Sequence, residues 1–385
     1  MRVKLDEVVD RITGNVDRFN TDLVYYCGGE HYESSSIAIY YPGLLESEKG
    51  RTLGFKFRFP FTAGDVLFMS RNPHLRKAGK VMFDGICSDT SYILRTKDNN
   101  VLLQDFLPLV IQNDNFWDFF EANKSGSVNY LLNWKEMQNY EFELPDIQKQ
   151  RKIAELAWSI EETRVKYRKL LLKTDELVKA QFIEMFGVPG TDEKGWGLTT
   201  LGECCVLNPR RPKDMNVDSD YSFVAMPSVS GKGIIDTSIH RPYAEINKGF
   251  TYFAENDVLF AKITPCMENG KGGVAIGLQN GAGFGSTEFH VLRPISGKSN
   301  PYWIYVITMF SKFRRDAEKV MTGTGGQRRV PILYLDEYLI ALPPLPLQEQ
   351  FASLVQQSYK SKFELERTLS DLDALYKRII SENFI

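Results

Sequence analysis

The chain has 385 residues, of which 43% are hydrophobic and 25% charged, and its formal net charge is −2. This composition is ordinary for a soluble chain of two or three domains, and its bulk charge gives no sign of nucleic-acid binding. No apolar run approaches the length of a membrane span, and acidic residues near the N-terminus stand where a signal peptide needs an apolar core. We therefore expect a cytoplasmic protein with no membrane association.

The cysteines give no sign of a disulfide framework or of a zinc site. They are odd in number and have no C-x-x-C spacing, so we interpret them as reduced thiols. They are Cys27, Cys87, Cys204, Cys205 and Cys266.

The first part of the chain predicts a strand-rich α/β region. Phe55–Phe61, Val66–Ser70 and Tyr92–Arg95 are rich in β-branched and aromatic residues and are bounded by Gly, Asn and Asp. A helical segment follows at about Leu102–Asn123, with many aromatic residues at helical spacing. Such aromatics are more often core than a stacking platform for bases, and we expect them in the core.

A long helix is predicted over Gln148–Phe186, which contains no Gly or Pro. Apolar or small residues recur in it at alternating steps of four and three, which is a heptad seam. A helix with one apolar stripe needs a partner in water. The predicted seam is Leu156, Ile160, Thr163, Tyr167, Leu170, Thr174, Leu177 and Gln181.

The rest of the chain repeats this order. Strands are expected at Phe250–Phe253, Val258–Ile263 and Phe289–Arg293, and a helix at about Pro301–Val320. A second long helix without Gly or Pro runs over Gln348–Phe384, and its seam predicts the partner of the first. That seam is Leu354, Ser358, Ser361, Leu365, Thr368, Leu372, Leu375 and Ile379.

Matching segments show that the chain contains two copies of one unit. The pattern F-x-x-x-D-V-L-F occurs at Phe61–Phe68 and again at Phe253–Phe260. Ser88–Arg95 matches Ser286–Arg293, Tyr140–Pro145 matches Tyr338–Pro343, and Leu5–Val8 matches Leu201–Cys204, always about 190–200 residues apart. Each copy is a globular part followed by a long helix.

No motif for catalysis is found. The four histidines have no metal-binding spacing, and neither a G-x-S-x-G elbow nor a G-x-x-x-x-G-K-[ST] phosphate loop is present. Asn208-Pro209-Arg210-Arg211 begins like the N-P-P-[YF] motif of adenine-N6 methyltransferases but lacks the second Pro and the aromatic residue, so we interpret it as a loop turn.

Two loops in matching positions are candidates for DNA contact. Backbone amides and hydroxyls suit phosphate oxygens, whereas Gln and Arg side chains can pair with adenine and guanine in the major groove. A Gly-rich basic loop is by itself more often a surface turn, but here it recurs in both copies. The candidates are Thr322, Thr324, Gln327, Arg328 and Arg329 in the second copy, Lys124, Ser125 and Asn129 in the first, and further cations at Lys56, Arg58 and Arg71.

These features together resemble the specificity (S) subunits of type I restriction-modification enzymes. The resemblance covers essentially the whole chain. It depends on the duplicated plan, on [GN]-D-V-L after a Phe, on the S-x(4)-[hydrophobic]-L-R strand, on T-G-x-G-G-Q before the last strand, and on Leu-Pro followed by Q-x-Q at the start of each long helix.

The resemblance implies an α+β fold with pseudo-two-fold symmetry. Residues 1–145 and 188–345 would be two similar strand-rich target recognition domains. Residues 146–187 and 346–385 would be long helices that form an antiparallel coiled coil, act as a spacer, and dock methyltransferase (M) subunits, two of them by expectation. Restriction (R) subunits would join the complex. The chain itself would read double-stranded DNA and catalyse nothing, and S-adenosylmethionine, ATP and Mg²⁺ would belong to the partner subunits.

Three other functions remain compatible with the sequence. The chain could be the recognition subunit of a type IIB-like restriction enzyme, in which one partner chain methylates and cleaves. It could be a nucleic-acid enzyme with an unrecognised site. It could also be a coiled-coil scaffold without a DNA role. The sequence gives neither the bases read nor the length of the gap between half-sites.

Overall fold

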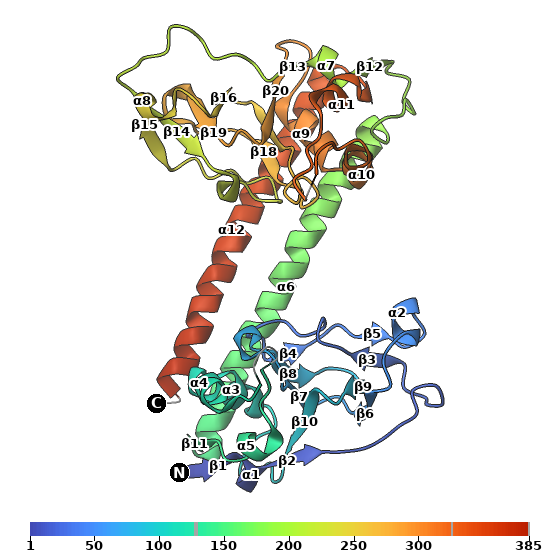
Figure 1. The fold of residues 1–385 in the computed structure, drawn as a ribbon, viewed down its shortest axis with the longest axis vertical. Coiled ribbons are helices and arrows are strands. Elements are labelled where there is room, and N and C mark those ends of the chain that lie inside the picture. The colour runs from blue at the N-terminus through green and yellow to red at the C-terminus, as the bar shows by residue number, and fades with distance from the viewer. Residues whose placement is uncertain (127–129, 325, 384–385) are drawn as a thin grey trace. The chain divides into compact units, whose positions relative to one another are not determined.

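The computed structural model describes residues 1–126, 130–324 and 326–383. The chain divides into two compact units, Met1–Lys169 with Glu366–Ile385, and Leu170–Leu365. Each unit has a globular part and part of two long helices, α6 (Ile147–Phe186) and α12 (Leu345–Asn383) (Figure 1). The sequence-based segments divide the chain at the ends of these helices, whereas the compact units divide within them.

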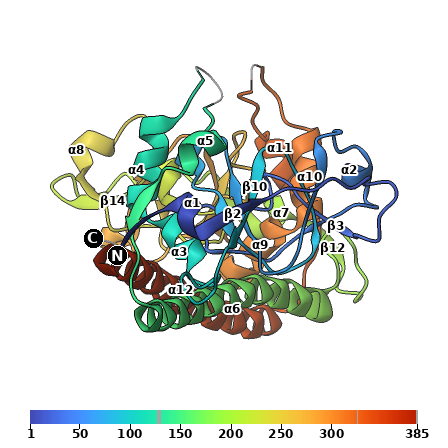
Figure 2. The ribbon, with the colours of Figure 1, turned by 90° about the horizontal axis from the view of Figure 1, so that it is seen from below.

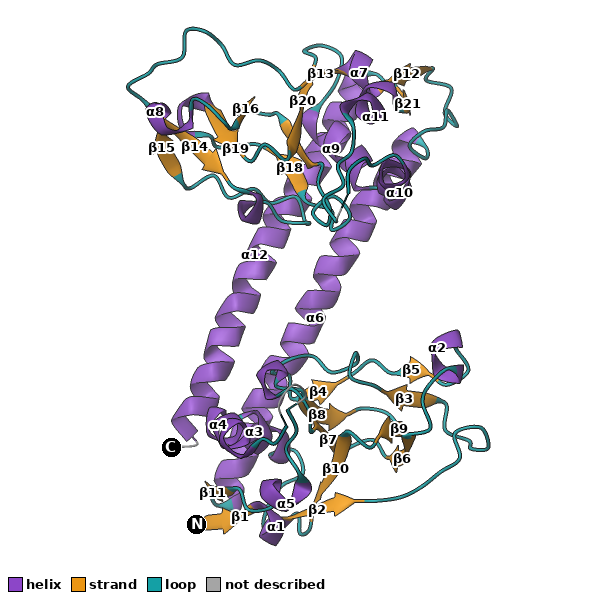
Figure 3. Ribbon diagram, viewed as in Figure 1, coloured by secondary structure: helices purple, strands orange, loops and turns teal. Residues whose placement is uncertain are grey.

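The globular part of the first unit combines short strands with short helices (Figure 3). Its sheets have the strand orders β1-β11, β2-β10-β7-β8-β4 and β5-β3-β9-β6, and the pairs β3/β9 and β4/β8 are parallel. The elements are β1 (Arg2–Lys4), α1 (Leu5–Val8), β2 (Val9–Ile12), β3 (Tyr25–Cys27), β4 (Ala38–Ile39), β5 (Gly43–Leu44), α2 (Glu48–Arg51), β6 (Phe57–Phe61), β7 (Val66–Met69), β8 (Ala78–Val81), β9 (Gly85–Ser88), β10 (Ser91–Thr96), α3 (Leu107–Gln112), α4 (Asp114–Asn123), α5 (Trp134–Met137) and β11 (Glu141–Glu143).

The second unit repeats this topology. Its strand orders β12-β21, β13-β20-β17-β18 and β15-β14-β19-β16 correspond to those of the first unit, except that β4 has no counterpart among the described strands, and β14/β19 is a parallel pair like β3/β9. The elements are β12 (Leu198–Thr200), α7 (Leu201–Cys204), β13 (Cys205–Leu207), β14 (Asp220–Val224), β15 (His240–Pro242), α8 (Tyr243–Ile246), β16 (Thr251–Ala254), β17 (Val258–Ala261), β18 (Gly272–Val274), β19 (Ala282–Gly285), β20 (Phe289–Pro294), α9 (Pro301–Met309), α10 (Ser311–Lys319), α11 (Ile332–Glu337) and β21 (Leu339–Ala341).

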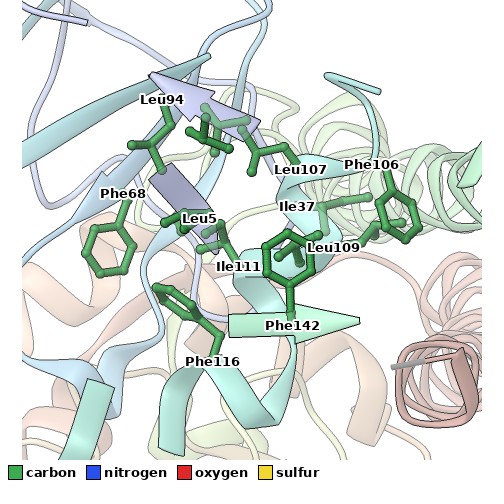
Figure 4. Close-up of a cluster of buried hydrophobic side chains, with 14 of the residues drawn as sticks. Leu5, Ile37, Phe68, Leu94, Phe106, Leu107, Leu109, Ile111, Phe116 and Phe142 are labelled. Carbon is green, nitrogen blue, oxygen red and sulfur yellow. The ribbon is translucent and has the colours of Figure 1, made fainter. Parts of the chain in front are cut away.

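The aromatic helical segments form the cores, as the sequence predicts. Phe116 and Phe120 are fully buried against Phe68 of β7 in the first unit, and Phe106 is buried in the same cluster (Figure 4 shows part of it). Each predicted helix is, however, a pair of shorter helices. The first breaks at Asn113, whose extended backbone (ψ 144°) and side chain cap α4, and the second breaks at Phe310 (ψ 135°). The break turns the helix so that both halves pack on the same core.

The repeated D-V-L-F and L-R motifs meet in the fold. In the first unit Arg95 donates to both carboxylate oxygens of buried Asp65, at 2.8 and 3.0 Å. In the second unit Arg293 does the same to Asp257, at 2.8 and 2.7 Å. The hydrogen bonds that Arg293 donates to Asp257 raise the pKa of Arg293. In each unit the Asp just before one strand, β7 or β17, is therefore joined to the Arg of the neighbouring strand, β10 or β20.

A buried glutamine fixes the start of each long helix on its globular part. The side chain of Gln150 accepts from the Leu103 amide (3.0 Å) and donates to the carbonyls of Val101 and Pro145, each at 2.9 Å. Gln348 makes the same three contacts, with the Asn300 amide (2.9 Å) and the carbonyls of Lys298 (3.1 Å) and Pro343 (2.9 Å). Both glutamines are fully buried. Gln150 and Gln348 are equivalent in the repeat, because each is the fifth residue after the Pro of a Leu-Pro pair, Pro145 or Pro343.

Within each unit, part of α6 packs against part of α12, and both helices appear as coils along the lower edge of Figure 2. In the first unit Ile160 of α6 shares a core with Tyr376 and Ile379 of α12. In the second unit the ring centroids of Phe182 and Phe351 lie 5.4 Å apart. The contacts pair later residues of α6 with earlier residues of α12, so the helices are antiparallel. The expected α+β fold with two long helices in contact is confirmed.

The buried stripe of the helices differs from the predicted seam. Leu156, Leu170, Leu177 and Leu375 are 49%, 47%, 56% and 45% exposed, and Tyr167, Leu354, Leu365 and Leu372 are half-buried, whereas Ile160 and Ile379 are buried. On both helices the buried positions are displaced by one residue, toward the C-terminus, from the predicted seam positions. On α6 it includes Ala157, Glu161, Arg164, Leu171, Val178 and Phe182, and on α12 Val355, Lys362, Tyr376 and Ile380.

Charged side chains explain this error. Glu161, Arg164 and Lys362 are between 0% and 7% exposed, and a search for apolar periodicity rejects the stripe that contains them. They tolerate burial because each is paired with an opposite charge or a hydrogen-bonding group.

Candidate nucleic-acid interface

The Gly-rich loop of the second unit is a hairpin that stands on the end of β17. The backbone groups of Thr322 and Arg329 exchange hydrogen bonds of 3.0 and 2.8 Å. Ile263, just after β17, forms a bridge with Arg329, and the Thr264 amide donates to the Arg328 carbonyl (3.0 Å). The base of the loop is thus a small extension of the sheet, which carries the tip outward.

The tip itself exposes polar side chains. Thr322, Thr324 and Gln327 are exposed, and the only contact made by Gln327 within the described residues is through its backbone, to Thr324 (3.2 Å) and to Arg329. Gly323 has φ +124°, and a Cβ there would lie 2.6 Å from the Gln327 carbonyl oxygen. The Gly is therefore required by the close approach of the two sides of the loop.

The two arginines of this loop are paired with carboxylates. Arg329 donates to both oxygens of Glu288, at 2.9 Å from Nε and 2.8 Å from Nη2, and this contact lowers the pKa of Glu288 and raises that of Arg329. Arg328 Nη2 lies 3.6 Å from Glu318 and 4.0 Å from Glu268. The loop segment has no acid of its own, but its neighbours supply three. Arg329 fixes the loop base and is not a free side chain for guanine.

A buried histidine supports the same loop base. His290 Nε2 lies 2.8 Å from the Val330 carbonyl and Nδ1 lies 3.2 Å from the Asn208 side-chain amide. Burial lowers the pKa of His290 to about 4, so the ring is neutral, with Nε2 donating to Val330 and Nδ1 accepting from Asn208. Asn208 has φ +45°, in agreement with the predicted turn.

The first unit builds its loop in the same way. Ser125 and Leu131 exchange backbone hydrogen bonds of 2.8 and 2.9 Å, and Leu131 also bridges to Arg71, just after β7. The Asn72 amide donates to the Tyr130 carbonyl (3.1 Å). The structure therefore brings Arg71, which the sequence offered only as a scattered cation, to the base of the predicted loop. Asn129 lies outside the described residues.

The other predicted cations of the first unit lie at the same end of the sheet or beside it. Lys124 pairs with Glu121 and lies 4.0 Å above the ring of Tyr130. Lys56 forms an ion pair with Asp89 (3.1 Å), in the turn before β10. Arg58 is exposed on β6 and contacts the ring of Phe59. The predicted cations of the first unit thus form two groups. Lys56 and Lys124 pair with protein carboxylates, whereas Arg58 and Arg71 form no salt bridge with the described residues.

The acidic partners were missed by the sequence analysis. Glu268 and Glu288 are distant in sequence from the loop that they contact, whereas Glu318 lies in the last turn of α10, shortly before the loop. Only Glu288, within the repeated Ser286–Arg293 segment, lay in a recognised motif. Among the described residues no group of three or more His, Cys, Asp or Glu side chains is placed to hold a metal ion. Likewise, no helix in that part of the chain is both long and apolar enough to cross a bilayer.

A family model described as type I restriction modification DNA specificity domain matches residues 193–372. The specificity subunit of the type I restriction enzyme EcoEI of Escherichia coli is 34% identical over 224 residues, which are 57% of this chain and 36% of that relative. The chain thus matches about a third of the relative's length.

Two solved structures share the fold. The S subunit of a type I restriction-modification system from M. genitalium aligns with a TM-score of 0.59 at 12% identity, over 100% of this chain and 96% of that one. A chain from a study of complex assembly and conformational transition in the type I system aligns with a TM-score of 0.50 at 20% identity, over 99% and 96%. Residues 193–372 thus match the type I restriction modification DNA specificity domain, and the chain is similar in sequence to a specificity subunit of a type I restriction enzyme.

Proposed function

We propose that this chain recognises a bipartite, asymmetric DNA sequence, with one globular part for each half-site. The observation that carries this proposal is a loop that recurs in both units. In each unit the base of the loop pairs with a residue that follows one strand, β7 or β17, and the sequence of the loop tip differs between the units. A shared base with different tips suits two modules that bind in the same manner and read different bases. The family model and the name of the E. coli relative support the same function.

The proposal also assigns roles to other subunits. Methyltransferase subunits, two of them by the symmetry of the repeat, dock on the paired helices, and restriction subunits join the complex. S-adenosylmethionine, ATP and Mg²⁺ belong to those partners, and this chain contributes recognition without catalysis. We propose the cytoplasm as the place of action; all five cysteines are free thiols, which fits a reducing compartment.

The test is co-expression of the full chain with the methyltransferase encoded beside it, followed by genome-wide mapping of methylated adenines. One motif with two short, unlike halves around a fixed gap is the expected result. Exchange of residues 188–345 for those of a relative must then change one half of the motif. An assembled, active complex that methylates without sequence preference would contradict the proposal, and methylation by the purified chain alone would show it to be an enzyme.

A further inference from the structure

Two phenylalanines of the first unit are among its most exposed side chains. Phe19, in the loop between β2 and β3, is 74% exposed, and Phe55, before β6, is 82% exposed. Arg18 joins the two loops: its Nη1 donates to the Gly54 carbonyl (2.6 Å) and its guanidinium lies 4.5 Å from the ring centroid of Phe19. The Val16 amide also donates to the Arg58 carbonyl (2.9 Å). These contacts hold both apolar rings out in water at one place.

The cations beside these rings are not neutralised. Arg18 and Arg58 form no salt bridge with a carboxylate of the described residues, in contrast to Arg328, Arg329 and Lys124 of the two loops. The nearest acid in sequence, Asp17, uses its carboxylate to accept from the Phe19 amide (3.0 Å). Two guanidiniums without a carboxylate partner among the described residues, next to two exposed rings, favour a ligand that is both anionic and able to accept apolar contact.

Contacts within the protein connect this region with the loop of the first unit. Lys56, between Phe55 and β6, pairs with Asp89 (3.1 Å). The adjacent Thr90 carbonyl accepts from the Ser70 amide (2.8 Å), and Arg71 bridges to Leu131 at the loop base. A chain of direct contacts thus leads from the exposed rings to the predicted DNA-binding loop.

The second unit has a cation in the matching place. Arg211, in the loop after β13, donates to the Asn247 carbonyl before β16, as Arg18 donates to the Gly54 carbonyl before β6. The guanidinium of Arg211 lies 5.7 Å from the ring of Tyr243. The position therefore carries an arginine with an aromatic neighbour in both copies, although the aromatic side chains differ.

We propose that Arg18, Phe19, Phe55 and Arg58 form a second DNA-contact surface of the first unit, which we call the Phe19–Phe55 surface. The two rings enter a groove of duplex DNA and contact base edges such as the thymine methyl group, while the two guanidiniums bind the flanking phosphates. This inference rests on the proposed function. It extends the contact area of the first unit beyond the loop and adds preference at positions that the loop does not reach.

Photocrosslinking tests the position of the surface. A benzoylphenylalanine is introduced at Phe19, at Phe55, at Ser125 in the loop, or at Tyr41, which is 68% exposed in the same unit and serves as the control. Each full chain is assembled with its methyltransferase on a duplex that carries the mapped site. We expect crosslinks to DNA from positions 19, 55 and 125 and none from 41. Crosslinks from position 125 but from neither position 19 nor position 55 would overturn this inference and leave the proposed function intact. If no position crosslinks and no methylation motif is found, both this inference and the proposed function are rejected.

Affinity measurements test its contribution. The double variant F19A/F55A should bind the mapped duplex about tenfold more weakly than wild type, while Tyr41→Ala should bind unchanged. Arg18→Gln should lower the slope of log Kd against log salt by about one. Since both rings are exposed, the thermal midpoints should be unchanged. Unaltered DNA affinity together with loss of self-association in sedimentation would overturn the inference and show that the rings contact a second copy of the chain.

Discussion

Arg164 of α6 and Asp373 of α12 form an ion pair in the first unit, with 2.8 Å between Nε and Oδ1. The repeat reproduces this pair in the second unit with the helices exchanged: Lys362 of α12 lies 2.6 Å from Asp175 of α6. Each buried cation is also linked to its own globular part, Arg164 through Glu161 and Lys362 directly. Arg164 donates to Glu161, which accepts from Ser36. Lys362 donates to the Lys232 carbonyl at 3.3 Å.

These cations are predicted to fix the register of the helices. Arg164→Met leaves Glu161, which is 0% exposed, without its cation, so the free energy of unfolding of the first unit should fall by about 3–5 kcal/mol. Lys362→Met should cost less, about 2 kcal/mol, because Asp175 remains 30% exposed. Thermal and urea unfolding measure both.

The matched control is Lys166→Met, on the same helix. Lys166 is 75% exposed and its pair with Glu162 spans 3.8 Å, so its loss should change stability by less than about 1 kcal/mol. Equal effects of Arg164→Met and Lys166→Met would show that the buried pair does not stabilise the helix contact. Arg164→Lys should retain most of the stability, because the second unit uses Lys at the equivalent place.

The two buried glutamines should be equally important. Gln150→Leu leaves the Leu103 amide and two carbonyls without their partner. Gln348→Leu leaves the Asn300 amide and two carbonyls without theirs. We expect each to destabilise its unit by about 2–4 kcal/mol, because unpaired buried polar groups retain their desolvation cost. Chemical denaturation measures the loss. Gln148→Leu, at an exposed position two residues earlier, is the control, and a loss as large there would attribute the effect to helix propensity.

The stability of the second unit should fall with acid. The folded-state pKa of His290, about 4, lies below its usual value of 6.5, so the unfolded chain binds a proton in this range that the folded chain does not. Stability contributed by neutral His290 is therefore full above pH 6.5 and is lost as the pH falls from 6.5 towards 4, by roughly 3 kcal/mol at most.

Thermal midpoints measured between pH 4 and 8 test this dependence. In His290→Gln the amide can still donate to Val330, and the loss between pH 6.5 and 4 should be smaller than in wild type. His240→Gln alters an exposed histidine and should leave the wild-type profile. A His290→Gln profile parallel to that of wild type would assign the acid sensitivity to other groups.

Gln327 and Arg329 should affect recognition differently. Gln327→Ala removes an exposed side chain, and we expect relaxed base preference at one position of one half-site, by about 1–3 kcal/mol. Arg329→Ala removes the contact with Glu288 at the loop base, and we expect weaker binding to all sequences without a change in preference. Binding competition among duplexes with single-base changes separates the two. Equal loss on every duplex for Gln327→Ala would mean that Gln327 contacts only phosphate.

The helices are predicted to determine the gap between half-sites. Seven residues inserted in both helices, after Lys169 and after Leu365, add about 10 Å of helix, the length of about three base pairs of DNA. Mapping of methylated adenines should reveal a longer gap with unchanged half-sites. Insertion in α6 alone breaks the antiparallel register and should abolish activity. An unchanged gap in the double insertion would reject the role of the helices as a ruler.

The sequence by itself determined the repeat, the two long helices and the places of the two loops. These depend on local signals: absence of Gly and Pro over long stretches, recurring motifs such as D-V-L-F, and Gly-rich turns. The same signals identified Gln150 and Gln348 as part of a pattern without revealing their role.

Tertiary structure decided which side chains are buried and which charges are free. The helix seam lies one residue from its predicted place because burial of Arg164 and Lys362 depends on partners from other elements. Arg329 looked free in sequence, yet Glu288 holds it. The sequence predicted Phe55 at the start of a strand and gave no signal at Phe19, and only the fold leaves both side chains exposed. Pairing and exposure are set by contacts between distant segments, which local periodicity does not contain.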